Sequence, residues 1–261
     1  IIKLGNRWIF GADDGVHGRE LWASDGTPAG TMMLADINTT TEYSGNSDPQ
    51  YPYIAGNIAY FRTFDGIRGW EMTATDGTPA GTVTFDFTPG RADSGPDQYA
   101  PTANGLVFRV NNGTNGHEPW FSDGTAAGTH MIKDFNAGGG SSDLQWAFSV
   151  GSRFVMRVND GQGWALWGSD GTTAGTMKIL PNCGNGSDPY ARDFRRLNNG
   201  AIFVADICGV TWHWMRTDGT VAGTTALDPD LTDNAWVQNL TVSNGVAYFS
   251  GTDAATGSEL W

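Results

Sequence analysis

The sequence predicts an all-β protein, a β-propeller of four-stranded antiparallel blades. The first observation is a turn sequence, Asp-Gly-Thr, that returns at a nearly constant interval. The turns begin at Asp25, Asp76, Asp123, Asp170 and Asp218, so that successive turns lie 51, 47, 47 and 48 residues apart. A period of this length is typical of repeat architectures, in which each repeat buries its apolar surface against its neighbours.

The second observation is composition. Among 261 residues there are 37 glycines, aromatic residues make up 12% and charged residues only 16%. This mixture disfavours helices and suits short strands joined by tight turns, and its aromatic content can bury a sizeable core. Helical spacing does not extend over a dozen residues anywhere in the chain.

The third observation is that each repeat divides into four short apolar segments. In the second repeat they cover residues 51–55, 58–64, 70–74 and 83–87, and the connections include Gly56-Asn57, Asp65-Gly66 and Asp76-Gly77. Such pairs favour hairpin turns, so each repeat is expected to form a four-stranded meander. Apolar runs such as 59–61 predict sheets covered on both faces, as in propeller blades. A right-handed β-solenoid would have shorter repeats and no hairpin turns.

We expect one propeller repeat domain that spans residues 1–261 and contains about six blades. The predicted blades cover residues 1–44, 45–93, 94–140, 141–186, 187–232 and, incompletely, 233–261. The last repeat has three strands and lacks a fourth. Either this blade is three-stranded or the sequence is a piece of a longer chain, and we expect the second.

The repeated stretch resembles a known family. Gly18-Arg19-Glu20-Leu21-Trp22-Ala23-Ser24-Asp25-Gly26-Thr27, continued to Thr31, resembles the ELWxxDGT repeat family of large bacterial proteins. The resemblance covers the chain once per blade, and it departs from the pattern at 70–72, 118–120 and 212–215. It implies export or surface attachment and a structural or adhesive role, and it implies no general enzymatic activity.

The expected function is therefore a non-catalytic, exported or cell-surface bacterial propeller, a scaffold, adhesion or interaction module whose partner is a protein or a glycan. The net charge of −13 argues against nucleic acid as a partner. The sequence contains no transmembrane segment, because no apolar run reaches about 18 residues. Two alternatives remain open, a lectin-like propeller that binds carbohydrate and a lyase-type enzyme that degrades polysaccharide.

The links between blades hold the candidate site residues. The candidates for ligand binding are Tyr51, Tyr99, Trp146, Tyr190 and Trp236. One aspartate precedes each innermost strand, and a ring of these carboxylates would suit Ca²⁺. The candidate calcium ligands are Asp48, Asp97, Asp143, Asp188 and Asp233. The alternative is that each aspartate only caps its own link.

Two further pairings are expected. Cys183 and Cys208 fall on the same face of the fifth repeat, which predicts a disulfide bond between them. Arg62, Arg109 and Arg157 share one repeat position, and they are expected to form ion pairs across strands with glutamates such as Glu71 and Glu118.

Overall fold

The computed structural model describes residues 1–181, 189–207, 212–227, 232–233, 240–253 and 257–261. These residues form strands, with one short 3-10 helix, η1 (Glu42–Gly45). The chain divides into two compact units, Ile1–Ser142 and Asp143–Trp261, which are called the N-terminal and the C-terminal unit below. The expectation of a single domain stays a prediction.

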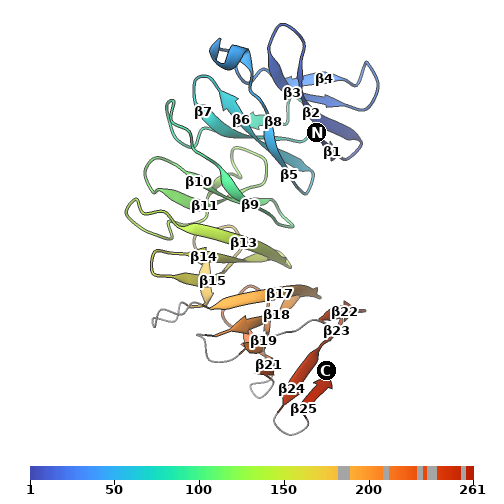
Figure 1. The fold of residues 1–261 in the computed structure, drawn as a ribbon, viewed down its shortest axis with the longest axis vertical. Helices are drawn as coiled ribbons and strands as arrows, with labels where there is room; N and C mark the ends of the chain where they lie inside the picture. Colours follow the sequence, from blue (N-terminus) through green and yellow to red (C-terminus); the bar gives the residue numbers. More distant parts are fainter. Residues whose placement is uncertain (182–188, 208–211, 228–231, 234–239, 254–256) are drawn as a thin grey trace. The chain divides into compact units, whose positions relative to one another are not determined.

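The N-terminal unit contains three four-stranded antiparallel sheets, whose strands follow one another in chain order (Figure 1). Blade 1 consists of β1 (Ile2–Leu4), β2 (Arg7–Asp13), β3 (Arg19–Ser24) and β4 (Met32–Ala35). Blade 2 consists of β5 (Gln50–Ala55), β6 (Ile58–Asp65), β7 (Gly69–Thr75) and β8 (Thr82–Thr84). Blade 3 consists of β9 (Asp97–Pro101), β10 (Leu106–Asn111), β11 (His117–Ser122) and β12 (His130–Met131).

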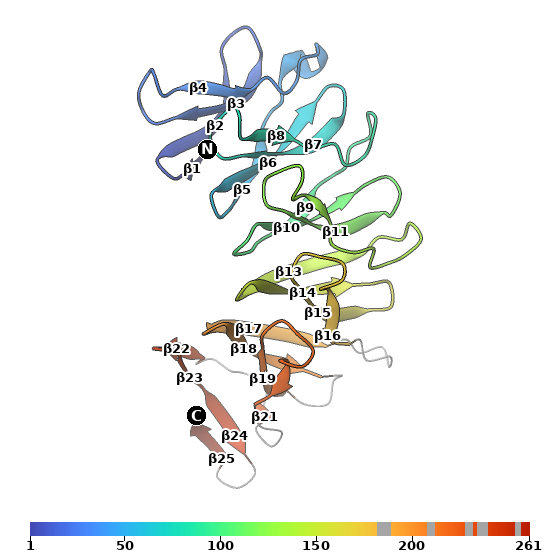
Figure 2. The ribbon, with the colours of Figure 1, turned by 180° about the vertical axis from the view of Figure 1, so that it is seen from behind.

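The C-terminal unit continues the same pattern, and Figure 2 shows its sheets from behind. Blade 4 consists of β13 (Asp143–Val150), β14 (Arg153–Asn159), β15 (Trp164–Ser169) and β16 (Met177–Leu180). Blade 5 consists of β17 (Tyr190–Leu197), β18 (Gly200–Asp206), β19 (Trp212–Thr217) and β20 (Thr225–Ala226). The remaining strands are β21 (Thr232–Asp233), β22 (Thr241–Ser243), β23 (Val246–Tyr248), β24 (Ser250–Asp253) and β25 (Gly257–Leu260).

The predicted fold class, an all-β protein made of propeller blades, is confirmed. Five sheets are antiparallel meanders, and in blade 5 β21 also pairs with β19 and links it to β24 and β25. The last repeat forms two hairpins, β22–β23 and β24–β25. In blade 2 the first three strands lie within one residue of their predicted ends. The fourth strand ends at Thr84 instead of residue 87, because the backbone N–H of Phe87 donates to the Glu71 carboxylate.

The apolar runs are explained by strands that face a core on both sides. In β6, Ala59 and Phe61 pack with Ile9 and Leu21 of blade 1. Tyr60 points to the opposite face, because successive side chains of a strand alternate.

The core between blades 2 and 3 is formed by Tyr60, Met72, Phe85 and Phe87 from one sheet and by Leu106, Phe108 and Val110 from the other. β18 is used in the same way in the C-terminal unit. There Phe203 packs toward Val155 and Leu166 of blade 4, while Ile202 and Val204 pack toward Leu240 and Phe249.

The repeated turn is held by a compact hydrogen-bond network, seen here in blade 3. Asp123 Oδ1 accepts hydrogen bonds from the backbone N–H of Thr125 at 2.9 Å and from its hydroxyl at 2.7 Å. Thr125 Oγ1 in turn accepts from the N–H of Gly128 at 3.0 Å, and the Thr129 hydroxyl donates to the Thr125 carbonyl at 2.7 Å. Ser122 Oγ lies 2.7 Å from Thr129 Oγ1 and closes the network. Each hydroxyl of the motif therefore has a backbone or side-chain partner.

The same network occurs in the other four complete blades. Its aspartates are Asp25, Asp76, Asp170 and Asp218. Hydrogen bonds from the neighbouring threonine lower the pKa of Asp25, Asp170 and Asp218, since they favour the charged carboxylate.

The glycine of the Ala-Gly-Thr sequence is required by this carboxylate. A Cβ added to Gly128 would lie 2.2 Å from Cγ of Asp123, and the other four motif glycines show the same approach. The repeat therefore conserves a contact between a carboxylate and a backbone that has room for no side chain.

We predict that Gly128→Ala destabilises the protein by about 1–3 kcal/mol, the usual cost of overpacking a filled site. In a background carrying Asp123→Ala the same substitution should cost much less, because the carboxylate that it meets is absent. Urea unfolding followed by tryptophan fluorescence measures both values. An equal cost in the two backgrounds would show that the contact with Asp123 is not the cause.

Candidate functional site

The first strands of blades 2 and 3 carry an irregularity at the same place. The pairing of β5 with β6 shifts between Gln50 and Tyr53, and the pairing of β9 with β10 shifts between Val107 and Arg109. Tyr51 and Gln98 have left-handed backbones, with φ of 48° and 51°. Bulges of this kind turn side chains away from the regular alternation, and they are frequent beside functional sites.

A cavity of about 400 Å³ lies beside these bulges in the N-terminal unit. It is lined by Tyr51, Tyr53, Arg62, Gly95, Pro96, Asp97, Gln98 and Tyr99. These residues are called the tyrosine pocket below. Its walls come from two neighbouring blades and from the link between them.

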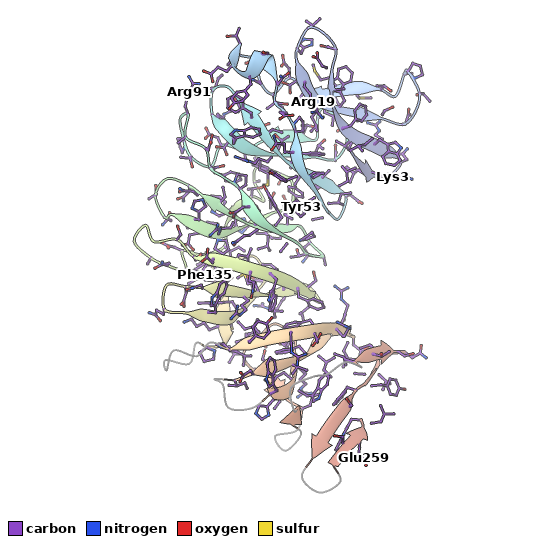
Figure 3. All side chains as sticks on the ribbon, viewed as in Figure 1. Lys3, Arg19, Tyr53, Arg91, Phe135 and Glu259 are labelled. Atoms are coloured by element: carbon purple, nitrogen blue, oxygen red, sulfur yellow. The ribbon has the colours of Figure 1, made fainter. Side chains whose placement is uncertain are left out.

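Two tyrosine rings form the wall of the pocket. The rings of Tyr53 and Tyr99 have centroids 4.4 Å apart at an interplanar angle of 33°, and Figure 3 labels Tyr53, a residue of β5. The Tyr99 hydroxyl donates to the Pro96 carbonyl at 2.8 Å. Burial raises the pKa of Tyr99 well above its ordinary value, so this hydroxyl stays protonated. Tyr51 remains 59% exposed at the mouth.

Arg62 supplies the positive charge of the pocket. Its guanidinium lies 4.5 Å from the ring of Trp70, in a cation–π contact. Its Nε is buried and has no hydrogen-bond partner. Within the described part of the chain no carboxylate forms an ion pair with Arg62. The pocket thus contains a charged group whose Nε has no acceptor in the described part of the protein.

Blade 3 shows the same arginine position with an acidic partner. Arg109 Nε donates to Asp97 Oδ1 at 2.9 Å, and its terminal nitrogen donates to Oδ2 at 2.7 Å. In blade 2 the residue opposite Arg62 is Gln50, and its amide donates to Asp48 at 2.9 Å. Asp48 also accepts from Arg19 at 3.2 Å, so that it is engaged away from Arg62.

Each of the five complete blades places one guanidinium near this end of the sheet, and the sequence revealed it only in blades 2, 3 and 4. In blade 1 the shared position is Gly11, and the guanidinium of Arg19 lies against it. Arg157 occupies the position in blade 4 and lies 4.5 Å from the ring of Trp164. In blade 5, Arg192 faces Val204 from the first strand and lies 4.6 Å from the ring of Trp212.

The expectation that these arginines pair with glutamates is wrong. Glu71 is fully buried and accepts hydrogen bonds from the Ser94 hydroxyl at 2.6 Å and from the Phe87 N–H at 3.4 Å. Glu118 bonds Ser142 and Phe135 in the same way. These glutamates accept hydrogen bonds from the segment that connects one blade to the next. The cross-strand register places their side chains next to this link and not next to the arginine.

Burial is the main reason that the pKa of Glu71 rises from 4.5 to about 7. The pKa values of Glu20 and Glu118 are raised by the same cause.

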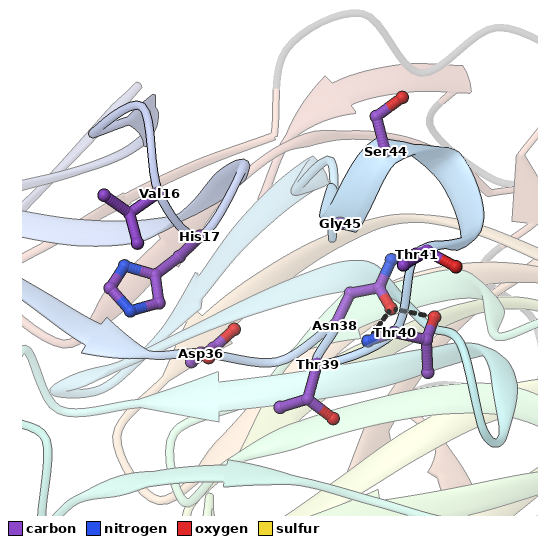
Figure 4. Close-up of a pocket in the computed structure, with 9 residues that line it drawn as sticks. All are labelled: Val16, His17, Asp36, Asn38, Thr39, Thr40, Thr41, Ser44 and Gly45. Atoms are coloured by element: carbon purple, nitrogen blue, oxygen red, sulfur yellow. Dashed lines mark hydrogen bonds between the residues drawn. The ribbon is translucent and has the colours of Figure 1, made fainter.

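A second cavity, of about 360 Å³, lies in blade 1 and the link that follows it (Figure 4). Most of its polar groups already bind each other. Asn38 accepts from the N–H and the hydroxyl of Thr40, as the dashed lines show, and donates to the carbonyls of Glu42 and Asn46. The His17 ring forms a hydrogen bond of 2.8 Å with the Asp14 carboxylate, and this bond raises the pKa of His17. The polar groups of this cavity therefore stabilise the fold of the link, and the tyrosine pocket is the better candidate for a ligand-binding site.

The structure brings two of the predicted ligand-binding residues, Tyr51 and Tyr99, into one pocket. Trp146 and Tyr190 belong to the C-terminal unit and do not line this pocket. Trp146 packs on Phe194 with centroids 5.0 Å apart and joins the core of the C-terminal unit, so it is not an exposed stacking platform. Tyr190 stands edge-on to Trp212 at 6.1 Å. Trp236 lies outside the described residues.

Three of the predicted calcium ligands, Asp48, Asp97 and Asp143, stand just before or at the start of a first strand, as expected. Asp48 and Asp97, however, bind arginines. Asp233 instead lies in β21 opposite Trp212 of β19, and its side chain is outside the described part, as is all of Asp188. Among the residues that the structure describes, no three His, Cys, Asp or Glu side chains are grouped to hold a metal ion.

Calcium binding thus stays a prediction without a described site. Cys183 and Cys208 also lie outside the described residues, so the disulfide stays a prediction. Nowhere in the described chain does a helix reach the length and apolar character that crossing a membrane requires.

No known protein family and no curated protein matches the chain. Among solved structures it is similar to a puromycin hydrolase, with 16% identity, a TM-score of 0.39 and coverage of 97% of this chain and 42% of that one. A prolyl endopeptidase matches with 9% identity, a TM-score of 0.47 and coverage of 99% and 40%. TolB from Acinetobacter baumannii matches with 9% identity, a TM-score of 0.36 and coverage of 98% and 65%. The chain spans about two fifths of the hydrolase and the endopeptidase.

This comparison contradicts the expected function, which was a non-catalytic exported or cell-surface scaffold, adhesion or interaction module. It also contradicts the two alternatives, a lectin-like propeller and a lyase-type enzyme. The matches named above are a hydrolase, a peptidase and TolB. At these identities the likeness assigns no activity to this chain.

We predict that Glu71→Gln removes a pH dependence of stability. The pKa of Glu71 is higher in the folded than in the unfolded chain, so ionisation between pH 4.5 and about 7 costs the folded state stability. The variant should match the wild type below pH 4.5 and exceed it increasingly up to about pH 7, by at most about 3 kcal/mol at 1.4 kcal/mol per pKa unit. Denaturant unfolding across this pH range measures the difference. Parallel curves for the two proteins would contradict the assignment.

Proposed function

We propose that the chain is a ligand-binding domain that takes a small organic molecule with a flat ring into the tyrosine pocket. The observation that carries the proposal is the combination of stacked tyrosine rings with an arginine whose buried Nε has no partner. Native proteins leave few buried polar groups unsatisfied, and such groups call for an explanation. A ligand that bonds Arg62 explains this one.

The size and the chemistry of the pocket support a small ligand. A volume of about 400 Å³ falls within the range of pockets for small molecules. The rings of Tyr51, Tyr53 and Tyr99 offer apolar, flat surfaces, and aromatic pairs prefer offset or edge-to-face stacking. Pockets of this kind combine apolar walls with a few polar groups that orient the ligand.

We further propose that the pocket binds its ligand without converting it. The Tyr99 hydroxyl keeps its proton and donates to Pro96, so it does not act as a base. Asp97 is held by both donors of Arg109. The chemistry that these residues offer is hydrogen bonding and stacking.

Membership of the ELWxxDGT repeat family and export to the bacterial cell surface stay predictions. Fractionation of the source cells tests the second one, and recovery of the protein only from the cytoplasm would refute it. The proposed pocket depends on neither.

We predict that aromatic fragments bind the purified chain and that Tyr51→Asn weakens them by about tenfold, through the loss of one stacking ring. Asparagine tolerates the left-handed backbone of Tyr51, and Tyr51 is largely exposed, so the fold should be preserved. Ligand-observed NMR against a set of neutral and charged benzene derivatives measures the affinities.

Ile67→Ser is a suitable control, because Ile67 is exposed and does not line the pocket. It should leave the affinities unchanged. The proposal fails if no fragment binds saturably, or if Tyr51→Asn binds every fragment as well as the wild type does.

A further inference from the structure

We infer that the ligand of the tyrosine pocket carries a carboxylate, which binds the guanidinium of Arg62. This inference rests on the proposed function and adds the chemical class of the ligand to it. The repeat itself provides the evidence, because neighbouring blades show the same arginine with and without an internal acid.

Blade 3 shows how this position binds a carboxylate. Arg109 and Arg62 lie 47 residues apart at the same place in the second strand. Arg109 holds Asp97 with two parallel hydrogen bonds, of 2.9 Å and 2.7 Å, one of them from Nε. This paired arrangement is the geometry in which a planar guanidinium recognises a planar carboxylate.

Blade 2 lacks that internal carboxylate. Gln50 stands opposite Arg62 where Asp97 stands opposite Arg109, and Gln50 directs its amide to Asp48. Asp48 in turn binds Arg19. The Nε of Arg62, which corresponds to the nitrogen that bonds Asp97 in blade 3, is therefore left without an acceptor.

The surroundings of Arg62 favour a bond at the edge of the guanidinium. Trp70 covers one face of the group at 4.5 Å. The N–H groups of a guanidinium lie in its plane, so the ring of Trp70, stacked on its face, does not occupy them. The tyrosine rings lie in the same pocket, where they can hold the apolar part of the acid.

The charge of the pocket selects a carboxylate over a phosphate. Arg62 is the only cationic side chain among the residues that line the pocket, and Asp97 lines it as well. The whole chain has a net charge of −13. A ligand with a single negative charge is balanced by one guanidinium, whereas a dianionic phosphate would leave one unbalanced negative charge, since the charge of Asp97 is already paired with Arg109.

The test compares ligands that differ only in their charged group. Benzoate and phenylacetate are titrated into the purified chain beside benzamide, phenylacetamide and phenyl phosphate, with ligand-observed NMR as the readout. We expect both acids to bind at least about tenfold more tightly than the matching amides, as charge-assisted hydrogen bonds allow. Phenyl phosphate should bind more weakly than benzoate.

Two substitutions at Gln50 provide the matched control. Gln50→Asp places in blade 2 the acid that blade 3 already has, so it should pair with Arg62 and remove the preference for acids over amides. Gln50→Asn adds no charge and should retain that preference. Arg62→Gln should also remove it, and circular dichroism checks that all three variants keep the fold.

The outcomes separate this inference from the proposed function. If acids and amides bind equally well and both depend on Tyr51, the proposed ligand-binding function is retained and the inference that the ligand carries a carboxylate is wrong. If phenyl phosphate binds most tightly of all the compounds, the inference that the ligand carries a carboxylate is also wrong. If Gln50→Asp keeps the full preference for acids over amides, Arg62 is not the group that binds the negative charge of the ligand. If no compound binds, the proposed function fails with the inference.

Discussion

The structure depends on the need of each sheet to bury two apolar faces. A strand such as β6 sends Ala59 and Phe61 to one neighbour and Tyr60 to the other, so a blade by itself would leave one face in water. Packing the next blade against it removes this surface, at a gain of roughly 25 cal/mol per Å². This packing also sets the first strands of blades 2 and 3 side by side. The stacked rings of Tyr53 and Tyr99 are a direct result.

The conserved turn has a different role, which is to make each meander regular. The motif carboxylate, hydroxyls and glycine form one closed network, and its parts depend on each other within ten residues. Such local networks favour the hairpin before any blade has packed on another. The hydroxyls of the network and one carboxylate oxygen are engaged at the turn, and none of the turn residues lines the tyrosine pocket.

Variation between repeats, and not the repeat itself, creates the candidate site. Arg109 and Arg62 have the same backbone place, yet only Arg109 faces an aspartate. The guanidinium comes from the third strand in blade 1 and from the first strand in blade 5. Equivalent blades thus keep a guanidinium near the same end of the sheet, while the group that faces this guanidinium changes from blade to blade. Neighbouring blades can therefore differ in what they bind.

The sequence by itself determined the strand order and the turns of the first five repeats, since these follow from local propensities and from a period that repeats along the chain. It also placed Tyr51 and Tyr99 among the ligand-binding candidates. Only the tertiary structure decided which side chains meet. Glu71 and Arg62 lie on paired strands, but the register and the β5 bulge send one to a buried serine and the other to an open pocket. Trp146 was expected at the surface and is packed on Phe194, because burial depends on the neighbouring sheet, which no local pattern records.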